Sequence, residues 1–248
     1  MLKLNIDVSA RIAGVLLLFL VWKSASAGMG SLVLASPEDS FRAAWRLLNN
    51  ADFVETHLAV TIFRISVSII SGVVAGVILG ILGGTRRHFF IFAEPFRRVL
   101  TSIPGIVAAV LAMLWFGLGS LMVIVLSTVF IVPTVYANVA EGIRLSDEKY
   151  IQVAEVFQIP VFYRVTDIYI PAVYSALCAS ILIVTGNCVR LVILAEVMGT
   201  ESGIGFVVSV SRARLDMPVL YGCVIICFGL VWLMESASKY LLRRWGSV

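Results

Sequence analysis

The stretch LAVTIFRISVSIISGVVAGVILGILG, residues 58–83, decides the fold class of this chain. It is almost wholly apolar, and it is longer than the roughly 20 residues that an α-helix needs to cross the hydrocarbon core of a bilayer. Its glycines Gly72, Gly76, Gly80 and Gly83 recur at intervals of four and then three residues, so they share one helix face. Such a face lets another helix approach closely, and the pattern therefore predicts a packed transmembrane helix.

The whole chain has the composition of a membrane protein. Of its 248 residues, 60% are hydrophobic and 14% are charged, against about 45–50% and 25% in an ordinary soluble domain. This excess of apolar residues argues against disorder, nucleic-acid binding and a secreted disulfide scaffold. The four cysteines lie in apolar runs without metal-ligand spacing, so we expect inert thiols and no metal site. They are Cys178, Cys188, Cys223 and Cys227.

Five further apolar runs complete a set of six predicted spans, and the fold class is therefore an all-α membrane protein. The runs are about 12–29, 103–118, 121–139, 171–198 and 218–240. The first run, which is followed by Ala25-Ser26-Ala27, also fits a cleavable signal peptide, but we prefer a retained helix. The third and fourth spans are separated only by Gly119 and Ser120, which predicts a tight helical hairpin.

Two shorter segments are predicted outside the spans. Residues 36–55 have apolar side chains at helical spacing and Ser36 before Pro37, so we expect an amphipathic surface helix with Ser36 as its N-cap. A glycine-punctuated loop leads from Gly199 to the last span. The chain thus divides into an N-terminal helix with a periplasmic amphipathic helix, residues 1–57, and a core of five spans, residues 58–248.

The basic residues predict the orientation of the chain. With the N-terminus in the cytoplasm, most Lys and Arg side chains near span ends fall on the cytoplasmic side, as they do in membrane proteins generally. They are Lys3, Arg11, Arg86, Arg87, Arg97, Arg98, Arg144, Lys149, Arg164, Lys239, Arg243 and Arg244. Because the number of spans is even, both termini are expected in the cytoplasm.

Two arginines lie within predicted spans. Arg64 is within two turns of the outer end of its span, so we expect its long side chain to reach the membrane interface. Arg190 lies deep in the fifth span, where an unpaired charge costs at least ~2.5–3.5 kcal/mol. We therefore expect Arg190 to face protein, water or a partner.

The sequence lacks the residues of common membrane-associated enzymes. It has no Gly-x-x-x-x-Gly-Lys-Ser/Thr nucleotide loop. Its two histidines, His57 and His88, fall on opposite predicted sides of the membrane, which excludes a histidine-based metal site or proton relay. We therefore predict no catalytic residues and no enzyme activity.

A polar stretch of about thirty residues, 141–170, separates the fourth and fifth spans. Its apolar side chains recur at helical spacing on both sides of Pro160, which predicts two short cytoplasmic helices. Such a pair could dock a soluble partner, or it could lie on the lipid surface.

Several motifs in this stretch and beyond it resemble those of the permeases of binding-protein-dependent ABC transporters. The residues Gln152-Val153-Ala154, then Gln158, then Ile168-Tyr169-Ile170-Pro171 match the spacing of the family's coupling motif, E-A-A, three residues, G, nine residues, I-x-L-P. Gln152 and Gln158 stand where the family usually has Glu and Gly. Three further segments also resemble the nitrate, taurine and alkanesulfonate branch: 76–87, LWFGLG at 114–119 following Pro104, and EVMGTESGIGF at 196–206.

The resemblance implies a type I importer of the inner membrane. Two permease subunits, a homodimer or a heterodimer, would form the pore in the bilayer. Two cytoplasmic ATPase subunits would use ATP and Mg, and a periplasmic or lipid-anchored binding protein would deliver the solute. This chain itself would hold no cofactor and bind no nucleic acid. The residues implied in coupling to the ATPase are Gln152, Val153, Ala154, Glu155, Phe157, Gln158, Ile168 and Pro171.

Four residues are candidates for the translocation path of a small, anionic or polar solute: Arg190, Glu196, Asn187 and Trp115. Arg190 could instead pair with an acid on another span or subunit, and Glu196 could hold an outer gate loop or simply be solvated at the interface. Asn187 and Trp115 could equally serve packing. The branch also includes permeases for a thiamine precursor and other organic solutes. An ion-coupled secondary carrier is the alternative from another transport class.

Overall fold

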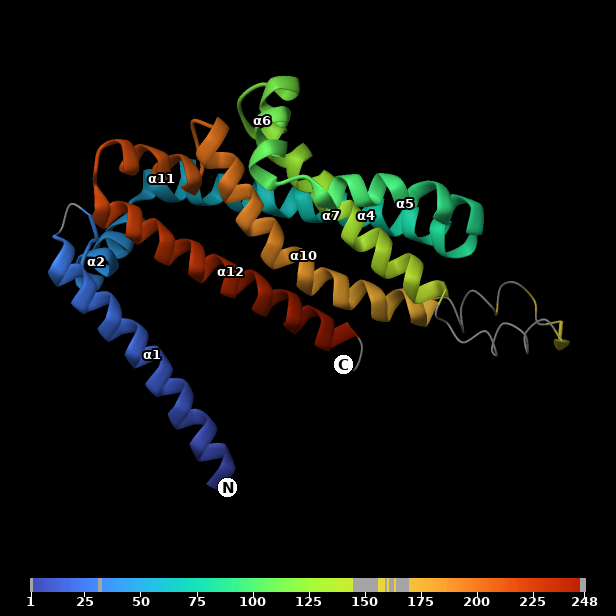
Figure 1. The fold of residues 1–248 in the computed structure, drawn as a ribbon, viewed down its shortest axis with the longest axis horizontal. Helices are drawn as coiled ribbons and strands as arrows, with labels where there is room; N and C mark the ends of the chain where they lie inside the picture. The colour runs from blue at the N-terminus through green and yellow to red at the C-terminus, as the bar shows by residue number, and fades with distance from the viewer. Residues whose placement is uncertain are drawn as a thin grey trace.

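The structure, a computed structural model, describes residues 2–30, 33–144, 156–158, 160, 163 and 170–245, and the regular elements among them are helices (Figure 1). Their bounds are α1 Leu2–Met29, α2 Pro37–Leu48, α3 Ala51–Phe53, the π-helical turn η1 Val54–Leu58, α4 Ala59–Thr85, α5 Arg87–Ser102, α6 Gly105–Phe116, α7 Ser120–Arg144, α10 Ile170–Gly199, α11 Ile204–Ala213 and α12 Met217–Trp245.

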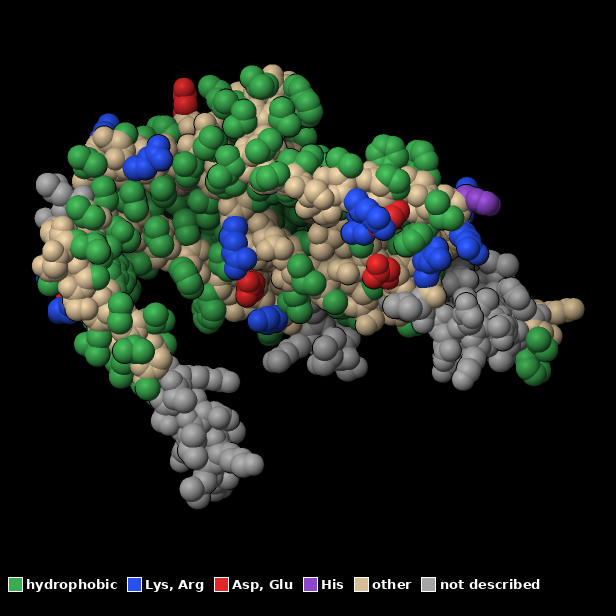
Figure 2. All heavy atoms as spheres, viewed as in Figure 1, with side chains coloured by type: hydrophobic (Ala, Val, Ile, Leu, Met, Phe, Trp, Pro, Cys, Tyr) green, Lys and Arg blue, Asp and Glu red, His purple; other side chains and the backbone are tan. Residues whose placement is uncertain are grey.

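The helices have the lengths and surfaces of a membrane bundle. Within the described residues, five are long and apolar enough to cross a bilayer: Ile12–Met29, Ala51–Thr85, Ser120–Arg144, Val173–Gly199 and Met217–Tyr240. The pair α5 and α6 would make a sixth span if it crosses as one broken unit. Apolar side chains cover most of the face seen in Figure 2. These observations confirm the predicted all-α membrane fold.

The most extensive helix packing in the described chain joins α4 to α7, which lie side by side in Figure 1. A Cβ atom added to Gly72, Gly76 or Gly80 would come within 2.6–2.7 Å of the Cβ atoms of Ile131, Val135 and Val139 respectively. The three glycines lie on successive turns of α4, and each one makes room for a β-branched side chain on the matching turn of α7. The predicted packing role of the glycine face is confirmed.

The third predicted span, 103–118, corresponds to the single helix α6, which is shorter than predicted and follows a second helix, α5, after a sharp bend. Ile103 has an extended backbone (φ −73°, ψ 125°), which is the conformation that a following proline favours, and it separates α5 from α6 with a bend of 101°. The 12 residues of α6 are about 18 Å long, too short to cross the hydrocarbon core. The sequence reading missed α5 because its charged side chains and internal Pro95 argue against a span.

The N-terminal region differs from the prediction in where one helix ends and the next begins. Ser36 caps α2 as expected, because its Oγ accepts a hydrogen bond from the backbone N–H of Asp39 at 3.1 Å. However, α2 ends at Leu48, and the next helical run begins at Ala51 and continues through η1 into α4. The second span thus starts about two turns before the predicted residue 58.

Helix α1 diverges from the rest of the bundle in Figure 1, and contacts it near α2. Trp22 Nε1 donates to the carbonyl oxygen of Ala35 at 3.1 Å, and Lys23 forms an exposed ion pair with Glu38. The apolar side chains of residues 15–18 are exposed. In the described chain, α1 is therefore held mainly through one end.

The region between the fifth and sixth predicted spans was expected to be a loop, but it contains the helix α11. Gly199 ends α10, and Gly203, at φ +99°, precedes α11 in a conformation that favours glycine. The 10 residues of α11 span about 15 Å, too little to cross a bilayer.

We predict that Gly76→Val destabilises the bundle, because its side chain would overlap Val135 and force α4 away from α7. Overpacking costs about 1–3 kcal/mol, which corresponds to a fall in Tm of about 2–12 °C for a chain of this size. Gly229→Val on α12 is the matched control, since no heavy atom lies within 4 Å of a Cβ there. Thermal unfolding of the detergent-solubilised chain measures both, and equal Tm values would contradict the packing account.

Candidate functional site

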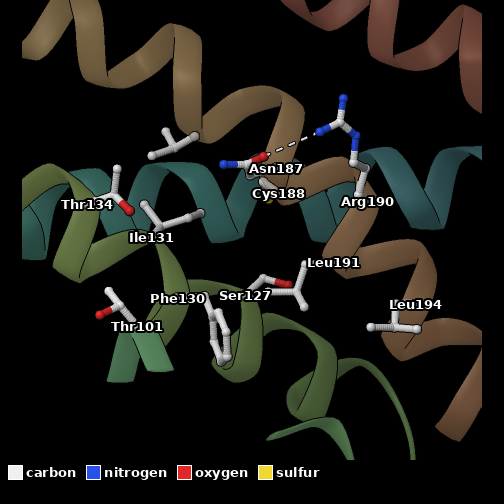
Figure 3. Close-up of a pocket in the computed structure, with 11 residues that line it drawn as sticks. Thr101, Ser127, Phe130, Ile131, Thr134, Asn187, Cys188, Arg190, Leu191 and Leu194 are labelled. Carbon is white, nitrogen blue, oxygen red and sulfur yellow. Dashed lines mark hydrogen bonds between the residues drawn. The ribbon is translucent and has the colours of Figure 1, made fainter. Parts of the chain in front are cut away.

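A cavity of about 390 Å³ lies between α7, α10 and the end of α5 (Figure 3). Its walls come from one face of α7 and one face of α10, because the lining positions on each helix are separated by three, four and seven residues. Those on α7 are Ser127, Phe130, Ile131 and Thr134, and those on α10 are Val184, Asn187, Cys188, Arg190, Leu191 and Leu194. The remaining lining residue is Thr101 of α5.

Arg190 and Asn187 form the polar rim of this cavity. Both side chains are exposed, and the Arg190 guanidinium donates a long hydrogen bond of 3.5 Å to Asn187 Oδ1 (Figure 3). No carboxylate of the described residues lies within ion-pair distance of Arg190. Its donors are therefore available to another acceptor, and a guanidinium binds planar or tetrahedral oxyanions well.

The cavity also contains hydroxyl groups. The Ser127 hydroxyl is buried without a hydrogen-bond partner among the described residues, and Thr101 and Thr134 line the same space. Phe130, Ile131 and Leu191 supply apolar wall. One guanidinium, one amide and several hydroxyls on an apolar wall suit a small polar or anionic molecule.

Of the four predicted path residues, the structure brings together only Arg190 and Asn187. Trp115 is 73% exposed on α6 and does not line the cavity, and Glu196 is fully buried elsewhere. The sequence reading missed Thr101, Ser127, Phe130 and Thr134. Three of these, Ser127, Phe130 and Thr134, share one face of α7. Their spacing of three and four residues was a sequence signal that they could line the same path as Arg190.

Glu196 lies instead in a polar cluster, which we define as Thr61, Arg64, Ser120, Glu196 and Ser202; Thr61, Arg64 and Glu196 are buried, Ser202 is half-buried and Ser120 is exposed. Arg64 Nη1 lies 2.7 Å from Glu196 Oε1, and the exposed fractions of the two side chains are 1% and 0%. The other Arg64 donors reach the hydroxyl of Ser120, at 2.9 and 3.1 Å, and the hydroxyl and carbonyl oxygens of Ser202, at 2.8 and 2.9 Å. Thr61 Oγ1 lies 2.9 Å from both carboxylate oxygens of Glu196.

The expectation that Arg64 reaches the membrane interface is therefore wrong. Its guanidinium points into the bundle because Glu196 of α10 supplies a countercharge there, and α7 and the 200–203 connection supply the remaining acceptors. Removing one partner of such a pair leaves an uncompensated buried charge, which typically costs about 3–5 kcal/mol.

The predicted coupling residues are described only in part. Gln152, Val153, Ala154, Glu155 and Ile168 lie outside the described residues. Phe157 is 75% exposed, and Pro171 is exposed in the first turn of α10. Gln158 adopts φ +49°, a left-handed conformation that costs a non-glycine residue roughly 1–2 kcal/mol.

A bundle of apolar spans around a cavity with a polar rim is the arrangement of a membrane transport subunit. The comparison with protein families agrees: the chain belongs to the family "Binding-protein-dependent transport system inner membrane component", whose model matches residues 72–246. It is a permease of an ABC importer, and a transport component rather than an enzyme.

Similar proteins span most of the chain. A Bacillus subtilis protein named as an aliphatic sulfonates transport permease, SsuC, is 27% identical over 76% of this chain and 68% of its own. A Haemophilus influenzae protein named as an ABC transporter permease is 24% identical over 98% of both chains. The inward-facing MetNI methionine ABC transporter shares the fold, with a TM-score of 0.65 at 18% identity over 76% of this chain and 94% of that one. The family does not support the ion-coupled carrier considered above.

We predict that the left-handed turn at Gln158 tolerates glycine and rejects a β-branched residue. Gln158→Gly relieves the backbone strain, whereas Gln158→Val adds about 1 kcal/mol or more and should reduce the population of this turn about fivefold. Co-purification of the ATPase and its turnover measure the effect. Loss of the ATPase in the glycine variant, or full retention in the valine variant, would contradict this prediction.

Proposed function

We propose that this permease forms the import path for a small anionic or polar solute of the sulfonate, taurine or nitrate type, and that Arg190 contacts the solute. The observation that carries the proposal is the exposed guanidinium at the rim of a 390 Å³ cavity, without a carboxylate partner in the described chain. That volume lies within the range of small-molecule sites, about 300–1,000 Å³.

The position of Arg190 within its helix supports this role. Arg190 is nine residues from the end of α10 at Gly199, so it lies about 14 Å inside the helix. A charge at that depth is costly in lipid and requires water, protein or a ligand as its environment. The names of similar proteins agree with an oxyanion: two are named for aliphatic sulfonates and one for taurine.

The proposed assembly contains two permease copies, two cytoplasmic ATPases that use ATP and Mg, and a periplasmic or lipid-anchored binding protein. Both termini of this chain lie in the cytoplasm of this arrangement, which places the 141–170 loop on the ATPase side. The N-terminal unit is 1–57, and the permease core is 58–248.

Coupling in this proposal runs through the 141–170 loop. Exposed Val156 and Phe157 provide apolar surface for a groove on the ATPase, and the left-handed turn at Gln158 sets the direction of the chain after it. Closure of the nucleotide sites then biases the permeases between two conformations, which is how a remote ligand drives a two-state element.

Replacing Arg190 tests the solute contact. Losing a charge-assisted hydrogen bond worth about 1.5–3 kcal/mol should weaken the apparent solute affinity about 10- to 150-fold in Arg190→Gln, with partial recovery in Arg190→Lys. The measurement is stimulation of ATP hydrolysis by taurine, an alkanesulfonate or nitrate in the reconstituted complex. The control is Arg42→Gln, an exposed arginine of α2. Unchanged stimulation in Arg190→Gln would refute the contact. Stimulation by a thiamine precursor alone would replace the proposed solute class.

Introducing charge at Ala154 tests the coupling segment. Ala154→Asp should release the ATPase or uncouple its turnover from uptake, because an ionised carboxylate cannot enter an apolar groove without a partner. Ala51→Asp, at the start of α3, makes the same substitution away from the loop. Normal co-purification and normal coupled turnover in Ala154→Asp would show that this segment is not the docking element.

A further inference from the structure

The polar cluster of Thr61, Arg64, Ser120, Glu196 and Ser202 shares the helix α10 with the cavity, but it faces another direction. Glu196 lies six residues after Arg190, which is about 120° around the helix axis. Arg190 and Asn187 line the cavity at its exposed rim, whereas Glu196 points to Thr61 and Arg64 of α4. The rotation of α10 about its axis therefore fixes both directions together.

The cluster is the strongest polar attachment of α10 among the described residues. The carboxylate of Glu196 accepts hydrogen bonds from Thr61, Arg64 and the backbone N–H of Gly205, the last at 3.0 Å. The rest of the described α10 surface packs on its neighbours mainly through apolar side chains such as Val189 and Val192. Apolar contacts are non-directional, so they constrain rotation less than a charged hydrogen-bonded pair.

The same pair supplies partners for irregular backbone beyond α10. Arg64 Nη1 bonds the carbonyl oxygen of Ser202, and Thr61 Oγ1 accepts the N–H of Ile204 at 2.9 Å. With the bond from Gly205 to Glu196, these contacts satisfy backbone groups at the start of α11 that have no helical partner. Within a bilayer, non-helical backbone is tolerated only where protein or water satisfies it in this way.

We propose that Arg64 and Glu196 are positioning residues for transport: they set the rotational register of α10 and so the direction in which Arg190 and Asn187 face. Neither residue touches the cavity. Their effect on the solute is indirect, through the orientation of a shared helix. The proposed control of α10 rotation is argued from the contacts described above. Only its effect on transport rests on the proposed contact between Arg190 and the solute.

The test replaces Arg64 and Glu196 and measures the rotation of α10 by cysteine labelling, with no solute present. Arg64→Met with Glu196→Leu removes both charges together, which proteins tolerate far better than removal of one. In a chain whose four native cysteines are replaced by serine, a single cysteine is placed at position 190, which is exposed, or at position 189, which is buried. A charged methanethiosulfonate reagent labels each in the full chain, reconstituted with its ATPase.

With the pair intact, Cys at 190 should react much faster than Cys at 189. In the double variant, the ratio of the two rates should fall at least tenfold, while a cysteine at Val139, buried against Gly80 of α4, stays protected. The control Lys23→Met with Glu38→Leu removes an ion pair whose side chains are 57% and 45% exposed, and it should leave the ratio unchanged.

Two results would overturn the proposal. One is an unchanged ratio in the double variant; the other is labelling at 139 together with 189, which would show general loosening and a structural role alone. If the double variant does not assemble, Thr61→Val keeps the ion pair but removes the hydroxyl that contacts both carboxylate oxygens of Glu196 and accepts the N–H of Ile204. It should lower the ratio about threefold, and no change would equally refute the proposal. A changed ratio combined with normal transport in Arg190→Gln would refute only the solute contact.

Discussion

The hydrocarbon core of a membrane offers no hydrogen bonds, so every polar group placed there must find its partner within the protein. In this chain the helix α4 satisfies that constraint where it meets the end of α10 and the start of α11. Its buried stripe carries Thr61 and Arg64 near one end and the glycines 72, 76, 80 and 83 toward the other. The polar end fixes α10 and the start of α11, and the glycine end brings α7 close enough to wall the cavity.

The two intramembrane arginines show how context decides the role of the same side chain. Arg64 has its donors satisfied by a carboxylate, two hydroxyls and a carbonyl, and its side chain is buried. Arg190 has only a long bond to Asn187 and remains exposed. The first arginine stabilises the architecture, while the second retains donors for something outside the chain. Charge and depth alone do not distinguish them, because the difference lies in what the neighbouring helices present.

Sequence reasoning recovered the features that depend on local pattern. The positions of most spans, the Ser36 cap and the packing role of the α4 glycines follow from periodicity and side-chain size, which neighbours in sequence determine. Sequence reasoning failed where a residue far away in the chain determines the environment of a side chain. Arg64 and Glu196 are 132 positions apart, and nothing in the spacing of either helix reveals their pairing. Helices α5 and α11 were missed because each is too short or too charged to read as a span.

The separation of Arg64 from Glu196 along the chain also has a consequence for biogenesis. At a synthesis rate of about 5–20 residues per second, the ribosome needs about 7–26 s to add the 132 residues between them. The Arg64 guanidinium therefore waits for this interval before Glu196 can act as its countercharge. The nascent helix must keep Arg64 in contact with water, headgroups or the insertion machinery until α10 arrives. The mature bundle is thus a state that α4 can enter only late in translation.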